Sequence, residues 1–249
     1  MSEKKAQTEV VELPSKGLLY PKENPLSLGT VELYYMTAKH EDILSNQNYI
    51  QQETVIDKLL QSLIASPIKY EDLLIGDKNA ILIAARILGY GQIYNFDITL
   101  SNGKKDKVSL DLTTLKEKHP DANVFKNSRE FSFTLPFKKN VITLKALNTH
   151  DEKLIDEELK GMKKISSEIS YEITTRLKHM IVAVDGKRET KDIRSFVDEE
   201  LLARDSRALR TFYSEMVPDV KMEFDYSKNG YTEEGITVPI TVDFFWPSE

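Results

Sequence analysis

The same order of short segments occurs twice in this 249-residue chain: a strand, then helices, then a hairpin. This repeat is the feature of the sequence that most constrains the fold. In the first half, Thr30 to Met36 alternates as a strand does, and Thr54 to Ala65 carries apolar residues at helical spacing. Two further strands, Ile93–Leu100 and Lys107–Leu112, flank the turn residues Ser101 to Lys104 and predict a hairpin. The second half repeats these kinds of segment at residues 130–135, 140–147, 150–178, 192–216 and 220–246. The pattern predicts an α+β fold.

Individual residues repeat along with the segments. Met36–Asp42 aligns with Ala146–Glu152, and Asp77 aligns with Asp205. We therefore predict an internal duplication that gives two similar lobes, each of helices plus antiparallel hairpin strands, around a shared core. The predicted boundaries are an extended N-terminal arm at residues 1–29, an N-terminal lobe at 30–129 and a C-terminal lobe at 130–249.

The arm opens with polar residues 1–12, which are expected to be frayed. Its next segment, Leu13–Pro21, contains two prolines and a glycine and therefore does not form a helix. Leu18, Leu19 and Tyr20 are nevertheless apolar, so the segment is expected to be extended and docked, either on its own domain or on a partner. A rigid extended segment loses little entropy on docking, which makes these three residues candidate partner contacts.

Glycines divide the helices that follow. Tyr70 to Ile75 is expected as a short helical turn that Gly76 ends, and Asp77 is expected to cap a helix that continues to Leu88. The glycines of the Gly-Tyr-Gly run after it then stop that helix.

Composition excludes several classes of function. The chain has 34 basic and 40 acidic residues, a net charge of −6, which argues against a general nucleic-acid surface. It has no cysteine, so disulfides, thiolate zinc sites and cysteine nucleophiles are excluded. Its longest apolar run, Ala80 to Ala85, is too short to span a membrane, and its N-terminus has no apolar signal-peptide core. These features fit a protein of the cytoplasm.

Local motifs for catalysis or metal binding are missing from the sequence. It has no GxSxG elbow, no phosphate-binding loop and no HExxH pair. His40 and His150 stand beside acidic pairs at equivalent repeat positions, which fits either two acid/base or metal centres or ordinary helix-start chemistry. The second interpretation is favoured, and we expect no catalytic residue, no cofactor and no metal: the chain is predicted not to be an enzyme.

Two other groups of residues are candidate partner contacts. Arg204, Arg207 and Arg210 recur every third residue and form a basic strip on a predicted helix. The strip fits an acidic partner, or ion pairing with Glu200 and Asp205, which is the commoner arrangement.

The C-terminus supplies the other group. Residues 236–246 are expected to be a strand whose alternating apolar side chains enter the core. The pair Phe245 and Trp246 then either closes that core or anchors a partner.

The sequence resembles the small proteins of the baseplate hub and its assembly in phages with T4-type contractile tails. The segments that carry the resemblance are Leu13–Pro21, Thr37–Leu44, Asp72–Asp77 with Arg86 and Gly89–Gly91, Val184–Gly186 and Phe244–Pro247. The resemblance spans about residues 13–247 and implies partners among the phage baseplate hub proteins. It implies an assembly factor, a chaperone-like protein of the host cytoplasm that promotes hub assembly. The alternative is a permanent structural subunit of the central hub, located in the virion tail.

Overall fold

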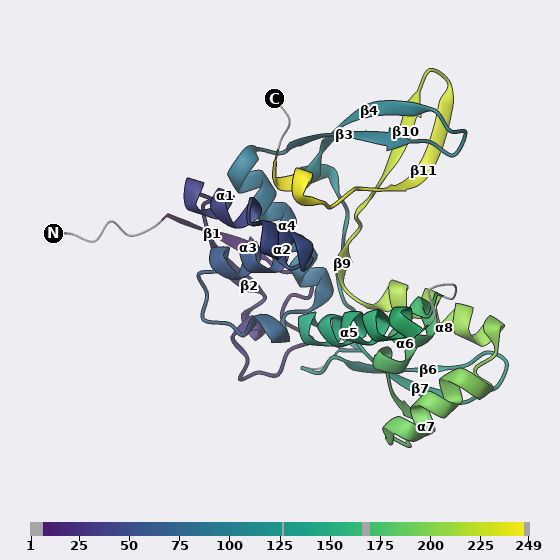
Figure 1. Cartoon of the computed structure of the whole chain (residues 1–249). Helices are drawn as coiled ribbons and strands as arrows, with labels where there is room; N and C mark the ends of the chain where they lie inside the picture. The colour runs from purple at the N-terminus through teal and green to yellow at the C-terminus, as the bar shows by residue number, and fades with distance from the viewer. Residues whose placement is uncertain (1–6, 126, 166–169, 247–249) are drawn as a thin grey trace.

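Two helical parts and a layer of two hairpins make up the computed structural model, which describes residues 7–125, 127–165 and 170–246 (Figure 1). Helices and small antiparallel sheets are mixed throughout, so the predicted α+β class is confirmed. Most buried apolar residues of all three parts join one continuous core.

The N-terminal part combines one two-stranded sheet with four helices. Its elements are β1 (Thr8–Glu12), β2 (Thr30–Tyr34), α1 (Ala38–Leu44), α2 (Gln47–Gln51), α3 (Val55–Leu63) and α4 (Ile75–Tyr90). β1 pairs antiparallel with β2, so the expectation of a frayed start is wrong for residues 8–12, while residues 1–6 lie outside the described residues. Little in the pattern of residues indicates this strand, because only Val11 turns a side chain toward the core, opposite Val31.

The C-terminal part packs helices on a three-stranded sheet. Its elements are β6 (Glu130–Thr134), β7 (Val141–Lys145), α5 (Thr149–Ile165), α6 (Glu172–Met180), β8 (Ile181–Val184), α7 (Thr190–Ser195), the π-helical η4 (Phe196–Glu200) and α8 (Ala203–Met216). The sheet order is β6-β7-β8, and both pairs are antiparallel. The expected helix from residue 166 begins at Glu172 within the described residues, and residues 166–169 lie outside them.

The third part is a layer of two hairpins, one from each half of the chain. They are β3 (Ile93–Thr99) with β4 (Lys105–Asp111), and β10 (Glu223–Lys228) with β11 (Tyr231–Thr237). The two lie together in Figure 1, and Phe96 meets Phe224 edge to face, with ring centroids 5.6 Å apart. The predicted boundary assigns β10 and β11 to the C-terminal lobe, but here they pack on the hairpin of the first half.

Short elements complete the chain. They are η1 (Pro25–Leu28), η2 (Tyr70–Asp72), η3 (Leu112–Thr114), β5 (Glu117–Lys118), β9 (Asp219–Val220) and η5 (Val242–Phe245). The expected strand over residues 236–246 is therefore wrong beyond Thr237. Pro239 lacks the N–H that a strand ladder needs, and the chain turns into the 3-10 helix η5 instead.

A buried aspartate fixes the start of one helix in each half, α4 in the first and α8 in the second. Asp77 is the third residue of α4 and is completely buried. Its carboxylate accepts hydrogen bonds from the backbone N–H of Ser15 (2.9 Å) and from the hydroxyl of Tyr20 (2.6 Å). These bonds hold the Leu-Pro turn after β1 against the helix.

Asp205 occupies the same position in the second half. It is the third residue of α8, is completely buried, and accepts the backbone N–H groups of Phe137 (2.9 Å) and Lys138 (3.0 Å). Phe137 and Lys138 follow a second Leu-Pro pair, Leu135-Pro136, after β6. The match of Asp77 with Asp205 agrees with the sequence alignment, while the duplication of the whole lobes stays a prediction.

Gly76 does not end a helix as expected, because α4 begins at Ile75 and runs through it. The backbone of the second half packs directly on this glycine. A Cβ added at Gly76 would lie 2.0 Å from the carbonyl oxygen of Pro218 and 2.8 Å from Cα of Asp219. Gly76 is therefore required by close packing between the two halves.

Gly76→Ala should destabilise the fold by about 2 kcal/mol or more, because the overlap with Pro218 outweighs the gain in helix propensity. Gly161→Ala in α5 is the matched control, since an added Cβ there meets nothing within 4 Å. This change should stabilise the chain by about 0.5–1 kcal/mol. Urea unfolding of both variants measures the difference, and two changes of the same sign would contradict the packing argument.

Candidate partner-binding surfaces

The apolar segment of the arm is part of its own domain. Leu19 and Tyr20 are buried and Leu18 packs half-buried on the same core. Burial, followed by the charge of Asp77, raises the pKa of Tyr20 well above its ordinary value. The sequence allowed this segment to dock either on its own domain or on a partner. In the structure it docks on its own domain, so Leu19 and Tyr20 are not accessible to a partner.

The stretch of chain between η3 and β6, which links the two halves, also covers this segment. The N–H of Asn127 bonds the carbonyl oxygen of Leu18 (2.9 Å), and the His119 ring lies 3.1 Å from the carbonyl oxygen of Pro14. Phe125, in the same segment, is buried in the core. The Leu-Pro turn of the first half is therefore a covered surface.

The arginine strip on α8 is exposed. Arg204, Arg207 and Arg210 all face solvent, and the ion pairs of the described residues include none of them. The acids expected to neutralise them are engaged elsewhere: Glu200 pairs with Lys138 at 2.9 Å, and Asp205 is buried. The alternative of local ion pairing is therefore not what this structure has.

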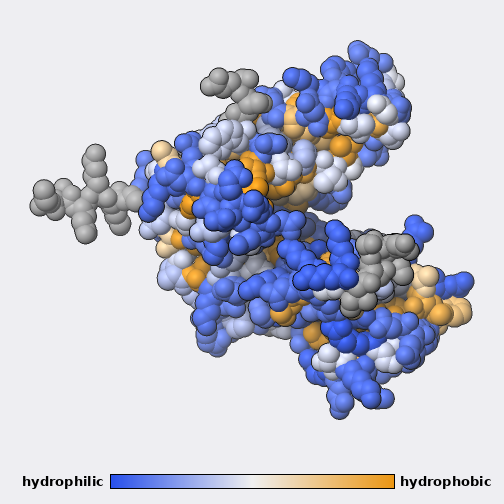
Figure 2. Space-filling view, in the orientation of Figure 1, coloured by the Kyte–Doolittle hydropathy of each residue, from blue (hydrophilic) through white to orange (hydrophobic). Residues whose placement is uncertain are grey.

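An apolar cluster missed by the sequence interpretation adjoins this strip. Phe137 is 56% exposed and Leu202 is 42% exposed. The guanidinium carbon of Arg204 lies 4.7 Å from the centroid of the Phe137 ring. Figure 2 shows apolar surface at this end of the C-terminal part, where α8 starts and β6 turns into β7. The one sequence signal for it was Phe137 directly after a Leu-Pro pair, where the first half has Ser15.

The terminal aromatic pair divides between core and surface. Phe245 is completely buried and meets Phe244 edge to face at 5.2 Å, and Phe244 meets Tyr94 at 4.9 Å. Trp246 is 46% exposed. Phe245 therefore closes the core, and only Trp246 is accessible to a partner.

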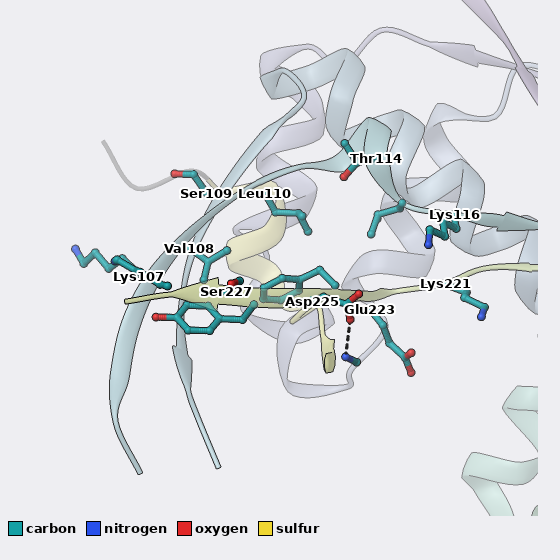
Figure 3. Close-up of a pocket in the computed structure, with 15 residues that line it drawn as sticks. Lys107, Val108, Ser109, Leu110, Thr114, Lys116, Lys221, Glu223, Asp225 and Ser227 are labelled. Carbon is teal, nitrogen blue, oxygen red and sulfur yellow. Dashed lines mark hydrogen bonds between the residues drawn. The ribbon is translucent and has the colours of Figure 1, made fainter. Parts of the chain in front are cut away.

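A groove of about 610 Å³ lies beside the hairpin layer, between β4 and β10 (Figure 3). Within the described residues β4 pairs only with β3, and β10 only with β11, so each strand keeps a free edge at the groove. Its apolar and aromatic lining comes from Val108, Leu110, Leu115, Phe224 and Tyr226. The sequence predicted both hairpins but not that they pack together, so this groove was not foreseen.

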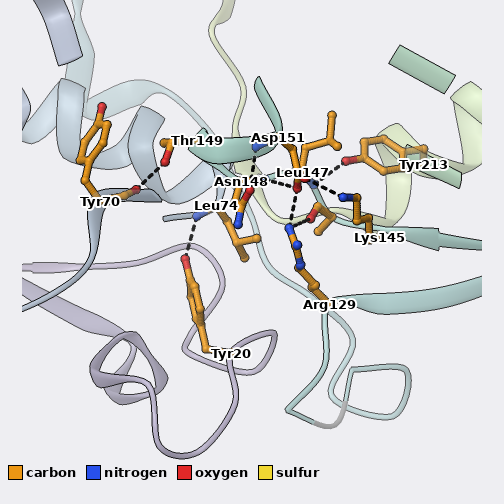
Figure 4. Close-up of polar contacts among 11 residues, drawn as sticks. Tyr20, Tyr70, Leu74, Arg129, Lys145, Leu147, Asn148, Thr149, Asp151 and Tyr213 are labelled. Atoms are coloured by element: carbon orange, nitrogen blue, oxygen red, sulfur yellow. Dashed lines mark hydrogen bonds and ion pairs between the residues drawn. The ribbon is translucent and has the colours of Figure 1, made fainter. Parts of the chain in front are cut away.

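A polar network at the start of α5 joins the two halves (Figure 4). Leu74 and Asn148 form an isolated antiparallel bridge, and the hydroxyl of Tyr213 receives the N–H of Leu147 at 3.0 Å. Thr149 donates its hydroxyl to the carbonyl oxygen of Tyr70. These contacts fix the start of α5 against the turn before α4.

Asp151 is the charged centre of this network. Its side chain is 3% exposed and pairs with Arg129 (2.5 Å) and Lys145 (2.6 Å). Burial alone raises the pKa of Asp151, but the hydrogen bond from Lys145 and the charges of both cations outweigh it, and the pKa is lowered. Asp151 also accepts the N–H of Asn148 at 3.2 Å and thus caps α5.

The two histidines of the predicted duplication have different roles. His40 accepts the N–H of Thr37 at 3.0 Å and so caps α1, as Asp151 caps α5. His150 is exposed in the first turn of α5. The helix-start interpretation fits His40. In the second half Asp151, and not His150, has the equivalent capping role. Among the described residues, no group of three His, Asp or Glu side chains is placed to hold a metal ion.

Asp151→Asn should lower the free energy of unfolding by about 2–3 kcal/mol at pH 7, because it leaves Arg129 and Lys145 half-buried without their counter-charge. The folded-state pKa is below the ordinary 3.8, so this stabilisation is present above about pH 4 and is lost as the pH falls through the folded pKa. Urea unfolding measures this effect: the difference in free energy of unfolding between wild type and variant should be smaller at pH 3 than at pH 7. An equal difference at both pH values would contradict the pairing.

Arginine and aromatic side chains, which are exposed together at the start of α8, are enriched in protein–protein interfaces. The family model described as T4 bacteriophage base plate protein matches residues 5–246, and the chain belongs to this family. Comparisons with curated proteins and with solved structures find no match. Among the described residues, no helix is both long and apolar enough to cross a membrane.

Proposed function

We propose that this chain is an assembly factor for the baseplate hub, which binds hub proteins and promotes their assembly without catalysing a covalent reaction. The observation that carries the proposal is the surface at the start of α8, where Phe137 and Leu202 are exposed near arginines that form no ion pair with the described residues, in a chain of the baseplate family. Arginine and aromatic residues are enriched where binding energy concentrates in protein interfaces. The host cytoplasm, where such assembly takes place, is the proposed location.

The second candidate is a permanent structural subunit of the hub, located in the tail of the virion. It is favoured by the family description, which names a baseplate protein. A permanent subunit requires large static interfaces, commonly above about 2,000 Å². The two candidates differ in whether the chain stays in the mature particle.

Co-expression with each baseplate hub protein of the same phage, followed by affinity capture of the full chain, tests the binding role. We expect at least one hub protein to be captured in stoichiometric amount, and capture of none would contradict the proposal. An unrelated phage capsid protein expressed in the same way is the control.

Mass spectrometry of assembly intermediates and of purified mature tails separates the two candidates. The assembly factor should be present in intermediates and absent from mature tails. A fixed copy number in mature tails would instead establish the structural subunit.

A further inference from the structure

One face of α4 is covered by other parts of the chain, whereas among the described residues the corresponding face of α8 is exposed to solvent. In the first half, β9 and the residue before it lie on α4, with the carbonyl oxygen of Pro218 against Gly76. The amide of Asn79, one turn further along, donates to Oδ1 of Asp219 at 2.9 Å. Leu82, one turn beyond that, is 4% exposed. An extended segment with an aspartate therefore occupies this face of α4.

The corresponding face of α8 carries the arginine strip. The two buried aspartates, each third in its helix, set the alignment of α4 with α8. In this alignment Gly76, Asn79 and Leu82 correspond to Arg204, Arg207 and Arg210. Where the first half has a close-packed and neutral face, the second half has three exposed cations.

Neighbouring surface adds an apolar end to the strip. In the first half the Leu-Pro turn is covered by the linker through Asn127, whereas in the second half the turn exposes Phe137. Arg204 lies over the Phe137 ring, so cationic and apolar surface are continuous at the start of α8. Leu202, directly before α8, is also exposed.

The dimensions of the strip match a short extended peptide. Three residues of helix rise about 4.5 Å, so the strip is about 9 Å long. An extended chain advances about 3.3 Å per residue, so three or four residues cover it. Carboxylates on such a segment meet arginines in charge-assisted hydrogen bonds, which are stronger than neutral ones.

We propose that the α8 strip, Arg204, Arg207 and Arg210, binds an extended acidic segment of a partner protein, with an apolar side chain of that segment against Phe137 and Leu202. The inference rests on the proposed function, because it names the surface through which the chain takes hold of a hub protein. β9 on α4 is the intramolecular example of the same arrangement.

The test uses the full chain and the hub protein that wild type captures. The charge-reversed variant R204E/R207E/R210E should bind that protein at least about 100-fold more weakly, since each cation becomes a repelling charge. K22E/K39E/K58E is the matched control, with three exposed lysines of the N-terminal part reversed. It should bind as wild type does. Rising salt should weaken wild-type binding steeply and the R204E/R207E/R210E variant little.

The apolar end is tested separately. Phe137→Ala should weaken binding about tenfold or more, whereas Leu28→Ala, at a residue 79% exposed on the N-terminal part, should not change it. Circular dichroism and urea unfolding of every variant establish that each is folded.

Each outcome has one meaning. If wild type captures a hub protein and the charge-reversed variant captures it equally well, this inference is overturned while the proposed function stands. If wild type captures no hub protein, the proposed function and this inference fall together. Strip-dependent binding of a 20-nucleotide single-stranded DNA in place of protein would also overturn the inference.

Discussion

A buried carboxylate at the third position of a helix is the interaction on which each half of this molecule depends. An ionised side chain loses several kcal/mol when it leaves water unless hydrogen bonds replace its hydration. Two backbone N–H groups offset this loss for Asp205. For Asp77, one N–H group and the Tyr20 hydroxyl offset part of it, and burial still raises the pKa of this carboxyl. Each aspartate also lies at the positive end of its helix. A turn that is distant in sequence is thereby bound to the helix start.

The binding surface follows from this constraint. Because Asp205 holds the N–H groups of Phe137 and Lys138, the Phe137 ring is fixed beside the first turn of α8, where Arg204 lies over it. In the first half the same constraint places Tyr20 where its hydroxyl receives the N–H of Leu74. A buried aspartate at the same position of its helix therefore stabilises a covered junction in the first half and positions an exposed basic and apolar surface in the second.

Periodicity predicted the regular elements well, and packing between distant segments decided the rest. The helix at Val55–Leu63 and the hairpin of Ile93–Thr99 with Lys105–Asp111 follow from local pattern and turn residues. The sequence alignment matched Asp77 with Asp205 but could not show that both are buried, because their hydrogen-bond partners, three backbone N–H groups and the Tyr20 hydroxyl, lie 57 to 68 residues away. The exposure of Phe137 was equally hidden, since a lone phenylalanine after a proline gives no sign of what covers it.

Equilibrium unfolding of Asp77→Asn and Asp205→Asn tests the central claim most directly. An amide keeps the shape of the side chain, but it places an NH₂ donor where the carboxylate accepted hydrogen bonds from N–H and O–H groups. Each variant should therefore lose about 2–3 kcal/mol of stability. Asp192→Asn is the matched control, because Asp192 is also the third residue of its helix, α7, but is exposed. The account predicts large losses for both buried sites and none beyond error for the control. Losses at Asp77 and Asp205 no larger than that at Asp192 would contradict it.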